Sequence, residues 1–170
     1  MYYSAKYESP VGMITLAGDG DNLIGLWIEG QKYFGGCVSE KMTEADTLFL
    51  FERVREWLDR YFRGERPSIR ELPLCPLGGE FRQCVWKILC EIPYGEVTTY
   101  GEIAKKAAAR MGKERMSAQA VGGAVGHNPI SIIIPCHRVI GTNGSLTGYA
   151  GGIDLKAKLL SHEGVDLTRL

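Results

Sequence analysis

The hydrophobic pattern of the chain changes its period at residues 63–79, and this change limits the possible folds more than any other feature. The segment, RGERPSIRELPLCPLGG, holds three prolines and three glycines, which interrupt helices and strands alike. Before it, apolar residues alternate over short stretches, and after it they recur at helical spacing. We therefore predict an N-terminal domain over 1–79, with its linker at about 63–79, and a C-terminal domain over 80–170.

The N-terminal domain is predicted to be a small antiparallel sheet covered by one helix. Residues 2–9, 13–18 and 23–28 have strand character, and turn-forming residues separate them. A helix is expected to begin near Thr47, because apolar residues then recur on one face: Leu50, Phe51, Val54, Trp57, Leu58 and Tyr61. This half shows no catalytic pattern, and we interpret it as a scaffold.

The C-terminal domain is predicted to be mostly helical, over residues 81–92, 98–111 and 118–126. Thr98 or Thr99 and Ser117 are suitable N-caps for the last two of these helices. Two short helices joined by a turn are typical of a helix-turn-helix, whose second helix contacts nucleic acid. The chain as a whole is therefore expected to be an α+β protein.

The second helix of this pair carries almost no side-chain bulk, because most of its residues are small: Ala118, Ala120, Gly122, Gly123 and Ala124. A glycine inside a helix costs about 1 kcal/mol relative to alanine. Two explanations remain open. The helix packs closely on a neighbouring helix, or it lies flush against a broad partner such as a nucleic-acid groove.

The net charge is zero, but the two halves differ in sign. Residues 1–80 hold nine basic and thirteen acidic residues, whereas residues 81–170 hold eleven and seven. A basic C-terminal half is consistent with a polyanionic partner. The chain shows no apolar run of membrane-spanning length and no signal-peptide pattern at its N-terminus, so we expect a cytoplasmic protein, or a nuclear one in a eukaryote.

Five cysteines occur, at positions 37, 75, 84, 90 and 136, and none forms a C-x-x-C pair. We expect reduced thiols, so that any special cysteine is special for its reactivity. The three histidines, at 127, 137 and 162, have no paired cysteines at zinc-ligand spacing. We therefore expect neither a metal nor a cofactor.

The stretch SIIIPCHRVIG, residues 131–141, has the pattern of a buried strand that ends at Pro135. A thiol, an imidazole and a guanidinium follow directly after this proline. A thiol is a strong nucleophile only as the thiolate. Neighbours on an extended segment point to opposite sides, so His137 needs a bridging water, or a turn after Pro135, to act on Cys136. Glu163, which stands before Gly164 at the end of a helical segment, is the candidate to orient His137.

PCHRVIG, preceded by NPISIII and followed by NGSLTGYAGG, resembles the active-site signature of the alkylguanine-DNA alkyltransferases, the methylated-DNA–protein-cysteine methyltransferases. The resemblance extends through VWKILCEIPYGEVTTYGEIA, AVGGAVGHNP and KLLSHEG, and so covers essentially all of 81–170. It implies a winged helix-turn-helix-like C-terminal domain. The N-terminal half is compatible with the smaller, ribonuclease-H-like domain of that family.

The resemblance implies a reaction in which Cys136 takes an alkyl group irreversibly from the exocyclic oxygen of guanine, or of thymine, in DNA. A relay of Glu163, His137 and a water would activate the thiol. Tyr100 would donate to the departing base, and Asn128 would order the backbone around the cysteine. The loop 148–152 would wall the pocket, with Ala150 N–H bonded to the guanine oxygen. The substrate-binding residues implied are Tyr149, Ala150, Val139 and Pro135.

The implied partner is duplex DNA containing alkylated guanine, bound by a monomer through its minor groove with the damaged base flipped out. The DNA-binding residues implied are Ser117, Gln119, Ala120, Gly122, Gly123, Arg138 and Thr142. Gln119 departs from the family, which usually has an arginine there to fill the space left by the flipped base. Glutamine lacks the charge and the planar stacking of arginine.

Two other functions remain to be separated by experiment. A DNA-binding module without transfer would leave Cys136 structural. A cysteine hydrolase built on Cys136, His137 and Glu163 would turn over repeatedly, but the sequence offers no evident oxyanion motif. The sequence also leaves open the preference between methyl and larger alkyl groups.

Overall fold

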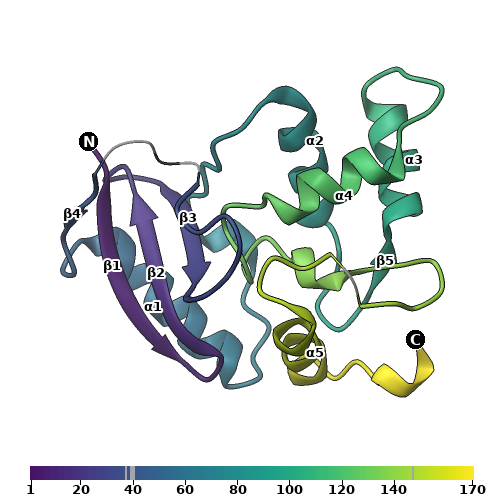
Figure 1. The fold of residues 1–170 in the computed structure, drawn as a ribbon. Coiled ribbons are helices and arrows are strands. Elements are labelled where there is room, and N and C mark those ends of the chain that lie inside the picture. Colours follow the sequence, from purple (N-terminus) through teal and green to yellow (C-terminus); the bar gives the residue numbers. More distant parts are fainter. Residues whose placement is uncertain (37, 39–40, 147) are drawn as a thin grey trace. The chain divides into compact units, whose positions relative to one another are not determined.

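The computed structural model describes residues 1–36, 38, 41–146 and 148–170, so that Cys37 lies outside the described residues. The chain forms two compact units (Figure 1). Unit 1 comprises Met1–Leu77 together with Pro129–Ser131, and unit 2 comprises Gly78–Asn128 and Ile132–Leu170. The predicted α+β class is confirmed: a small sheet with a helix occupies unit 1, and helices dominate unit 2.

The sheet of unit 1 has the order β3-β2-β1-β4. Strands β1 (Tyr3–Ser9), β2 (Gly12–Gly18) and β3 (Leu23–Ile28) form the predicted antiparallel meander. A two-residue strand that the sequence pattern does not indicate, β4 (Thr43–Glu44), pairs parallel to β1. All six residues of β3 are buried, because β3 makes further backbone contacts on its outer side.

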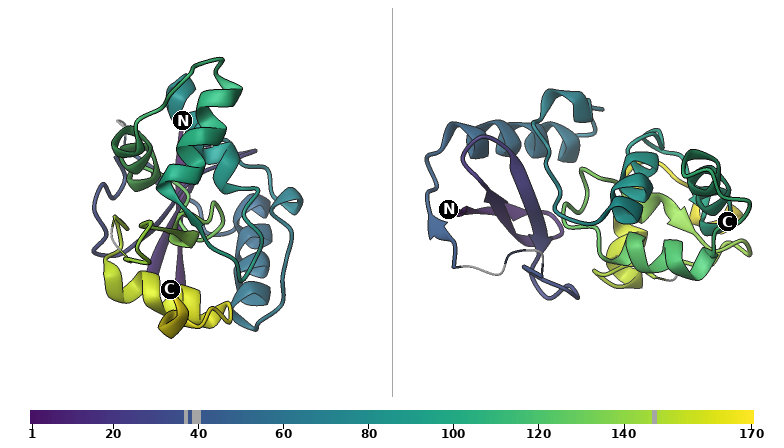
Figure 2. Two further views of the ribbon diagram at one scale, coloured as in Figure 1. Left: turned by 90° about the vertical axis from the view of Figure 1, so that its right-hand side faces the viewer. Right: turned by 90° about the horizontal axis from the view of Figure 1, so that it is seen from above.

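Helix α1 (Phe49–Phe62) lies along one face of this sheet (Figure 2). Its six buried side chains are the six that the periodicity predicts: Leu50, Phe51, Val54, Trp57, Leu58 and Tyr61. The packing is close at Gly18 of β2, where an added Cβ would come within 2.5 Å of the Leu50 side chain. The first half is thus a conventional sheet-and-helix core.

Two segments distant in sequence add backbone hydrogen bonds to β3. Leu23 N–H donates to the Pro73 carbonyl at 2.8 Å, and Leu26 N–H donates to the Pro129 carbonyl at 2.8 Å. The predicted linker 63–79 is therefore not free chain throughout: it holds a short 3-10 helix, η1 (Ile69–Glu71), and part of it pairs with the sheet. The chain also returns to unit 1 over Pro129–Ser131.

Unit 2 holds helices α2 (Glu80–Leu89), α3 (Tyr100–Arg110), α4 (Ala118–Gly126) and α5 (Ile153–His162), with a short 3-10 helix, η3 (Leu167–Arg169), at its end. Helices α2, α3 and α4 pack on one another. The predicted caps are confirmed for α3 and α4, since the Thr99 side chain accepts from Glu102 N–H at 3.1 Å and that of Ser117 from Ala120 N–H at 3.2 Å. Strands β5 (Thr98–Thr99) and β6 (Val139–Ile140) pair in parallel beside the helices.

The strand predicted at residues 131–134 is wrong. These residues form a turn, in which Ile132 has the unusual φ of 70°. A short apolar run indicates burial without distinguishing a strand from a turn. Here the Asn128 side chain, rather than a neighbouring strand, bonds the Ile134 carbonyl at 2.8 Å.

The four cysteines in the described part of the chain, Cys75, Cys84, Cys90 and Cys136, are free thiols, as predicted. No helix among the described residues is long and apolar enough to cross a membrane. Nor do three or more His, Cys, Asp or Glu side chains in this part of the chain gather as a metal site would require.

Candidate functional site

Cys136 begins a 3-10 helix, η2 (Cys136–Arg138), immediately after the turn 131–134. Its side chain is only 4% exposed. The buried Asn128 amide fixes the turn by donating to Ile134 O. A hydrogen bond between the Asn128 side chain and Cys136 lowers the pKa of the thiol. Burial acts more strongly in the other direction, so the pKa of the resting thiol lies above its ordinary value. The thiol therefore needs a base before it can react.

His137 and Glu163 form a buried pair beside this cysteine. His137 Nε2 lies 2.6 Å from Glu163 Oε2, and both side chains are fully buried. The 3-10 turn of η2 follows Pro135. Such a turn is one of the two arrangements that would allow His137 to act on Cys136, the other being a bridging water. Among the described residues, His137 Nδ1 has no hydrogen-bond partner.

The protonation states of this pair follow from their surroundings. Burial raises the pKa of Glu163, but hydrogen bonds from His137 and Arg138 outweigh it and hold the pKa well below its usual range. Burial lowers the pKa of His137, which is therefore neutral near pH 7. Because the ionised carboxylate can only accept, Nε2 carries the imidazole proton and Nδ1 is left as a proton acceptor.

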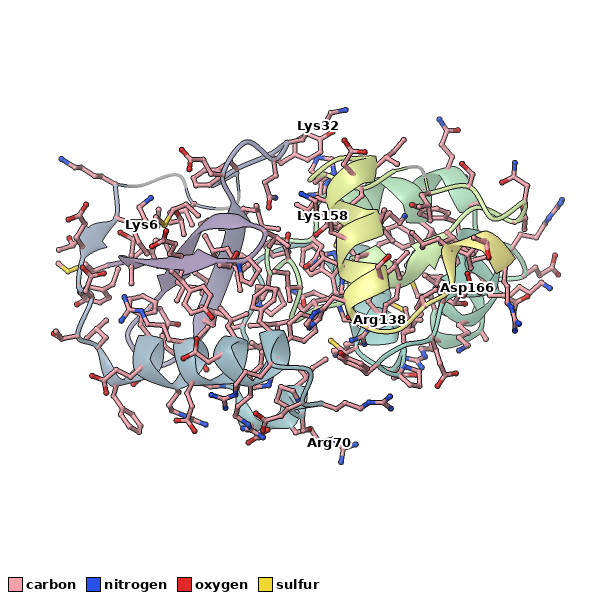
Figure 3. All side chains as sticks on the ribbon, turned by 90° about the horizontal axis from the view of Figure 1, so that it is seen from below. Lys6, Lys32, Arg70, Arg138, Lys158 and Asp166 are labelled. Carbon is pink, nitrogen blue, oxygen red and sulfur yellow. The ribbon has the colours of Figure 1, made fainter. Side chains whose placement is uncertain are left out.

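Arg138 holds the Glu163 carboxylate from the other side. Its Nε and Nη2 donate to Oε1 and Oε2 at 2.7 and 3.1 Å, and Nη1 donates to the Ile92 carbonyl at 2.6 Å. The guanidinium also lies 5.7 Å from the Tyr94 ring centre, and Figure 3 shows Arg138 beside α5. Gly95 N–H also donates to this carboxylate, at 3.1 Å. The structure thus does not bring Arg138 together with the exposed residues of α4.

The predicted pocket residues differ in exposure. Pro135, Val139 and Tyr149 are buried, and Ala150 is half-buried. Tyr100 begins α3, is half-buried, and has its pKa raised to about 12 by burial and by the charge of Cys136. The backbone of Gly148 passes close to this side chain, since a Cβ added to Gly148 would lie 2.5 Å from the Tyr100 hydroxyl oxygen.

The predicted DNA-contact residues of α4 are solvent-accessible. Ser117, Gln119, Ala120 and Gly123 are exposed, and Gly122 is half-exposed. Thr142, which lies apart from them in the loop after β6, is also exposed. A Cβ added to Gly122 or Gly123 would meet nothing within 4 Å. Close packing on a neighbouring helix therefore does not explain these glycines.

One buried residue of this unit escaped the sequence analysis. Lys156 on α5 is 0% exposed, and its Nζ lies 5.9 Å from the Tyr100 ring centre. A signal was present, because Lys156 shares one helical face with Leu159, Leu160 and the candidate Glu163. Gly95 was likewise not singled out, and no pattern in its neighbourhood indicates its bond to Glu163.

Comparison with known proteins relates both units to one family. Residues 80–165 match the description "6-O-methylguanine DNA methyltransferase, DNA binding domain", and residues 1–76 match the ribonuclease-like domain of the same methyltransferases. A methylated-DNA–protein-cysteine methyltransferase of Methanosarcina acetivorans is 47% identical over 169 residues, which cover 96% of this chain and 99% of that protein. Its Haemophilus influenzae counterpart is 42% identical over 163 residues, covering 96% and 86%.

Solved structures agree with this relation. The Mycobacterium tuberculosis O6-methylguanine methyltransferase superposes with a TM-score of 0.82 at 42% identity, covering 99% of both chains. The M. tuberculosis OGT in complex with DNA superposes with a TM-score of 0.81 at 42% identity, covering 95% of this chain and 91% of that one.

Proposed function

The chain belongs to the O6-methylguanine DNA methyltransferase family, and we propose that it repairs DNA by moving an alkyl group from alkylated guanine, or thymine, irreversibly onto Cys136. The observation that carries the proposal is the orientation of His137. Its Nε2 is held at 2.6 Å by Glu163, while Nδ1 is buried and has no partner among the described residues. A buried proton acceptor on the residue that follows a buried thiol supports the generation of a nucleophile.

We propose that the thiol proton passes through a water to His137 Nδ1. Glu163 stabilises the imidazolium that forms, because it is ionised and bonded to Nε2. The Cys136 thiolate then attacks the alkyl carbon, the new S–C bond forms and the C–O bond breaks. The electron pair of that bond leaves with the base, to which Tyr100 donates a proton. The thioether is stable, so each molecule reacts once.

We propose that duplex DNA binds on the exposed face of α4 with the damaged base flipped toward Cys136. Small residues at Ala120, Gly122 and Gly123 support this proposal, because they permit close approach to the walls of a minor groove. Little sequence is read there, as suits a lesion that arises anywhere. Gln119, exposed near the start of the helix, would occupy the space left by the base.

The groups that take part directly in the proposed reaction are confined to one of the two units of the molecule. The proposed relay, pocket and DNA-contact helix α4 all belong to unit 2, which supports action by a single chain. We propose that the protein acts as a monomer, in the cytoplasm or, in a eukaryote, in the nucleus. We propose that residues 80–170 act as the DNA-binding and acceptor domain and that residues 1–79 support them. The two units as observed differ from this division at Pro129–Ser131.

Intact-mass measurement after incubation with methylated-guanine duplex tests the function. We expect one methyl group per chain, mapped to Cys136 by peptide mass, and no turnover with excess DNA. Cys136→Ala should gain no mass and still bind the lesion. Unmodified wild-type protein that binds the duplex would support a lesion-binding module instead, and modification at Cys84 or repeated turnover would contradict the proposal.

A further inference from the structure

Two buried polar side chains of unit 1 meet just before the turn that presents Cys136. Apart from aromatic residues, the buried polar side chains of this unit, in the part of the chain that the structure describes, are Thr15, Gln31 and Ser131. Burying a polar side chain is costly unless a hydrogen bond compensates it. Thr15 accepts from Lys6, whose Nζ lies 2.7 Å from its hydroxyl. Gln31 and Ser131, which are 100 residues apart in sequence, are bonded to each other.

The Gln31 side chain lies just after β3, where backbone groups hold it in place. Its Oε1 accepts from Ile28 N–H at 2.8 Å, and its own backbone N–H donates to the Ile28 carbonyl at 3.0 Å. Its Nε2 donates to the Lys32 carbonyl at 3.3 Å. The same Oε1 also accepts from the Ser131 hydroxyl at 3.3 Å. Because an amide oxygen has two lone pairs, Gln31 can close the turn after β3 and bind Ser131 with one atom.

Backbone pairing holds the segment before the turn on β3 as well. Leu26 N–H donates to the Pro129 carbonyl at 2.8 Å, and Ser131 N–H donates to the Leu26 carbonyl at 3.0 Å. Ser131 is the first residue of the turn 131–134, and it is also the last residue of this segment that belongs to unit 1. The turn therefore begins at a residue that is fixed through both its backbone and its side chain.

The turn needs to be held, because Ile132 has a φ of 70°. A β-branched residue rarely adopts this conformation, which persists only where the surrounding contacts impose it. At the far end of the turn, the Asn128 amide donates to Ile134 O at 2.8 Å, and Cys136 N–H donates to the same carbonyl at 2.8 Å. At the near end, the contacts of Ser131 hold it. The strained turn is thus fixed on both sides, and Cys136 follows directly after it and one proline.

We propose that Gln31 is a positioning residue of alkyl transfer, which acts through Ser131 to hold the turn that places Cys136. This inference rests on the proposed function, and it gives the N-terminal half a specific part in the reaction. Without the Gln31 acceptor, the Ser131 hydroxyl loses this bond and Ile132 relaxes toward an ordinary conformation. The effect passes along the chain, so that Cys136 shifts relative to Asn128, whose side-chain hydrogen bond lowers the pKa of the thiol. A shift of about 1 Å in a reacting group can slow a reaction about 100-fold.

Gln31→Met and Ser131→Ala, with Thr15→Val as their control, test the inference. The first removes the acceptor and keeps a side chain of similar length, and the second removes only the hydroxyl that this acceptor binds. Thr15 lies on β2, one strand away from β3, so its variant removes the bond of the third buried polar side chain without reaching residues 129–131. In single-turnover assays, both test variants should slow methyl transfer about 10- to 100-fold, and the control should keep the wild-type rate. Equal rates in all three variants would overturn the inference.

The pKa of the thiol separates positioning from a general loss of stability. Thiolate absorbance, taken as the difference from the same protein carrying Cys136→Ala, should show a higher pKa in both test variants, because the Asn128 bond weakens. The control should keep the wild-type pKa, and the charge of Lys156, which also lowers it, is the same in every variant. Duplex binding should stay within about twofold of wild type. A slow test variant whose thiol keeps the wild-type pKa would show that the turn has not moved, and would overturn the inference.

A double variant tests the route through Ser131. If Gln31 acts through the Ser131 hydroxyl, Gln31→Met and Ser131→Ala together should slow transfer little more than Gln31→Met alone. Multiplied effects would show that the two residues act separately, and would contradict this route. The wild-type protein separates the two levels of the proposal. Without methylation of Cys136 in the wild type, the proposed function itself fails, whereas wild-type methylation with a fully active Gln31→Met overturns only the role of Gln31.

Discussion

Glu163, His137 and Cys136 are buried together, and burial alone would favour the uncharged form of each. Arg138 changes this balance, because its two hydrogen bonds keep the Glu163 carboxylate ionised. The carboxylate in turn fixes the proton on Nε2 of His137 and leaves Nδ1 to accept one. From their chemistry, the sequence singles out these three residues as the candidate relay. It groups Arg138 with the DNA contacts, because sequence does not reveal that this guanidinium points into the protein.

Glu163→Gln tests this chain of dependence through stability. The pKa of Glu163 is lowered in the folded state, so its contribution to stability is fully present above the unfolded pKa of about 4.3. That contribution is lost as the pH falls toward the folded pKa. We expect the variant to be less stable at pH 7 by on the order of 3 kcal/mol, because Arg138 loses its charged partner. Denaturant unfolding should show this difference shrinking below about pH 4; a constant difference would contradict the assignment.

The same variant should slow methyl transfer far more than it weakens duplex binding. In the proposed relay, the carboxylate stabilises the imidazolium formed during activation, and it is bonded by His137 and Arg138 of η2. Single-turnover rates and binding titrations on the folded variant measure the two effects. An unchanged rate and pH profile would show that Glu163 is outside the relay.

Gly148→Ala tests the position of Tyr100. A Cβ at Gly148 would lie 2.5 Å from the Tyr100 hydroxyl, and the residue has a φ of 83°. Gly152→Ala is the matched control, because Gly152 has a φ of 92° but nothing within 4 Å of the added atom. Both variants should lose about 1 kcal/mol to backbone strain, measured by thermal unfolding. Only Gly148→Ala should also slow transfer, and equal rates would show that the hydroxyl can move without consequence.

At the scale of elements, the helices are predictable and the turn that presents Cys136 is not. The buried face of α1 and the caps of α3 and α4 follow from local patterns. The turn at 131–134 depends on the Asn128 side chain and on the left-handed Ile132, neither of which periodicity reveals. In α4, the sequence raises two explanations for the glycines, and the open space above them excludes only close packing on a neighbouring helix.

Gly123→Ala and Gly123→Leu test the use of that open face. Alanine should stabilise the protein by about 1 kcal/mol, since it is the better helix former and meets no neighbour. Leucine should fold as well but weaken duplex binding, because its bulk holds the helix away from the groove. Transfer from free alkylated guanine should be unchanged in both variants. Tight duplex binding by Gly123→Leu would show that this face does not contact DNA.

Gln119→Ala and Gln119→Arg test what fills the space of the flipped base. Alanine should slow transfer from duplex DNA and spare transfer from free alkylated guanine, which needs no flipping. Arginine should bind the duplex more tightly and with a steeper salt dependence, by up to about one unit of slope. The ratio of duplex to free-base rates is the measurement. Equal slowing of both by alanine would mean that Gln119 supports the pocket or the fold instead.

At the scale of the whole molecule, the division of charge can be seen in the sequence, whereas the path of the chain between the two units cannot. The acidic excess lies in residues 1–80 and the basic excess in residues 81–170, which nearly matches the division into units. The return of Pro129–Ser131 to unit 1 could not be predicted, because the pairing of Leu26 with Ile130 joins positions far apart in sequence. Such contacts are fixed by the folded core and leave no local pattern.

The charge division predicts where the salt dependence of DNA binding resides. Lys113 and Arg115 are exposed between α3 and α4, where they line a groove of about 470 Å³ that reaches Ala118 at the start of α4. Each cation that contacts a phosphate contributes about one unit to the slope of log binding constant against log salt. We therefore expect the double variant Lys113→Gln, Arg115→Gln to bind undamaged duplex with a salt dependence that is lower by about one to two units of slope.

The matched control changes a lysine and an arginine in unit 1. Lys32→Gln with Arg70→Gln removes the same charge from exposed positions of the acidic half (Figure 3), so the net charge of the two double variants is identical. If binding depends on net charge alone, both variants weaken it equally. If the phosphates lie along α3 and α4, only the Lys113 and Arg115 variant loses slope, while transfer from free alkylated guanine stays at the wild-type rate. Equal slopes in the two variants would place the DNA elsewhere on the protein.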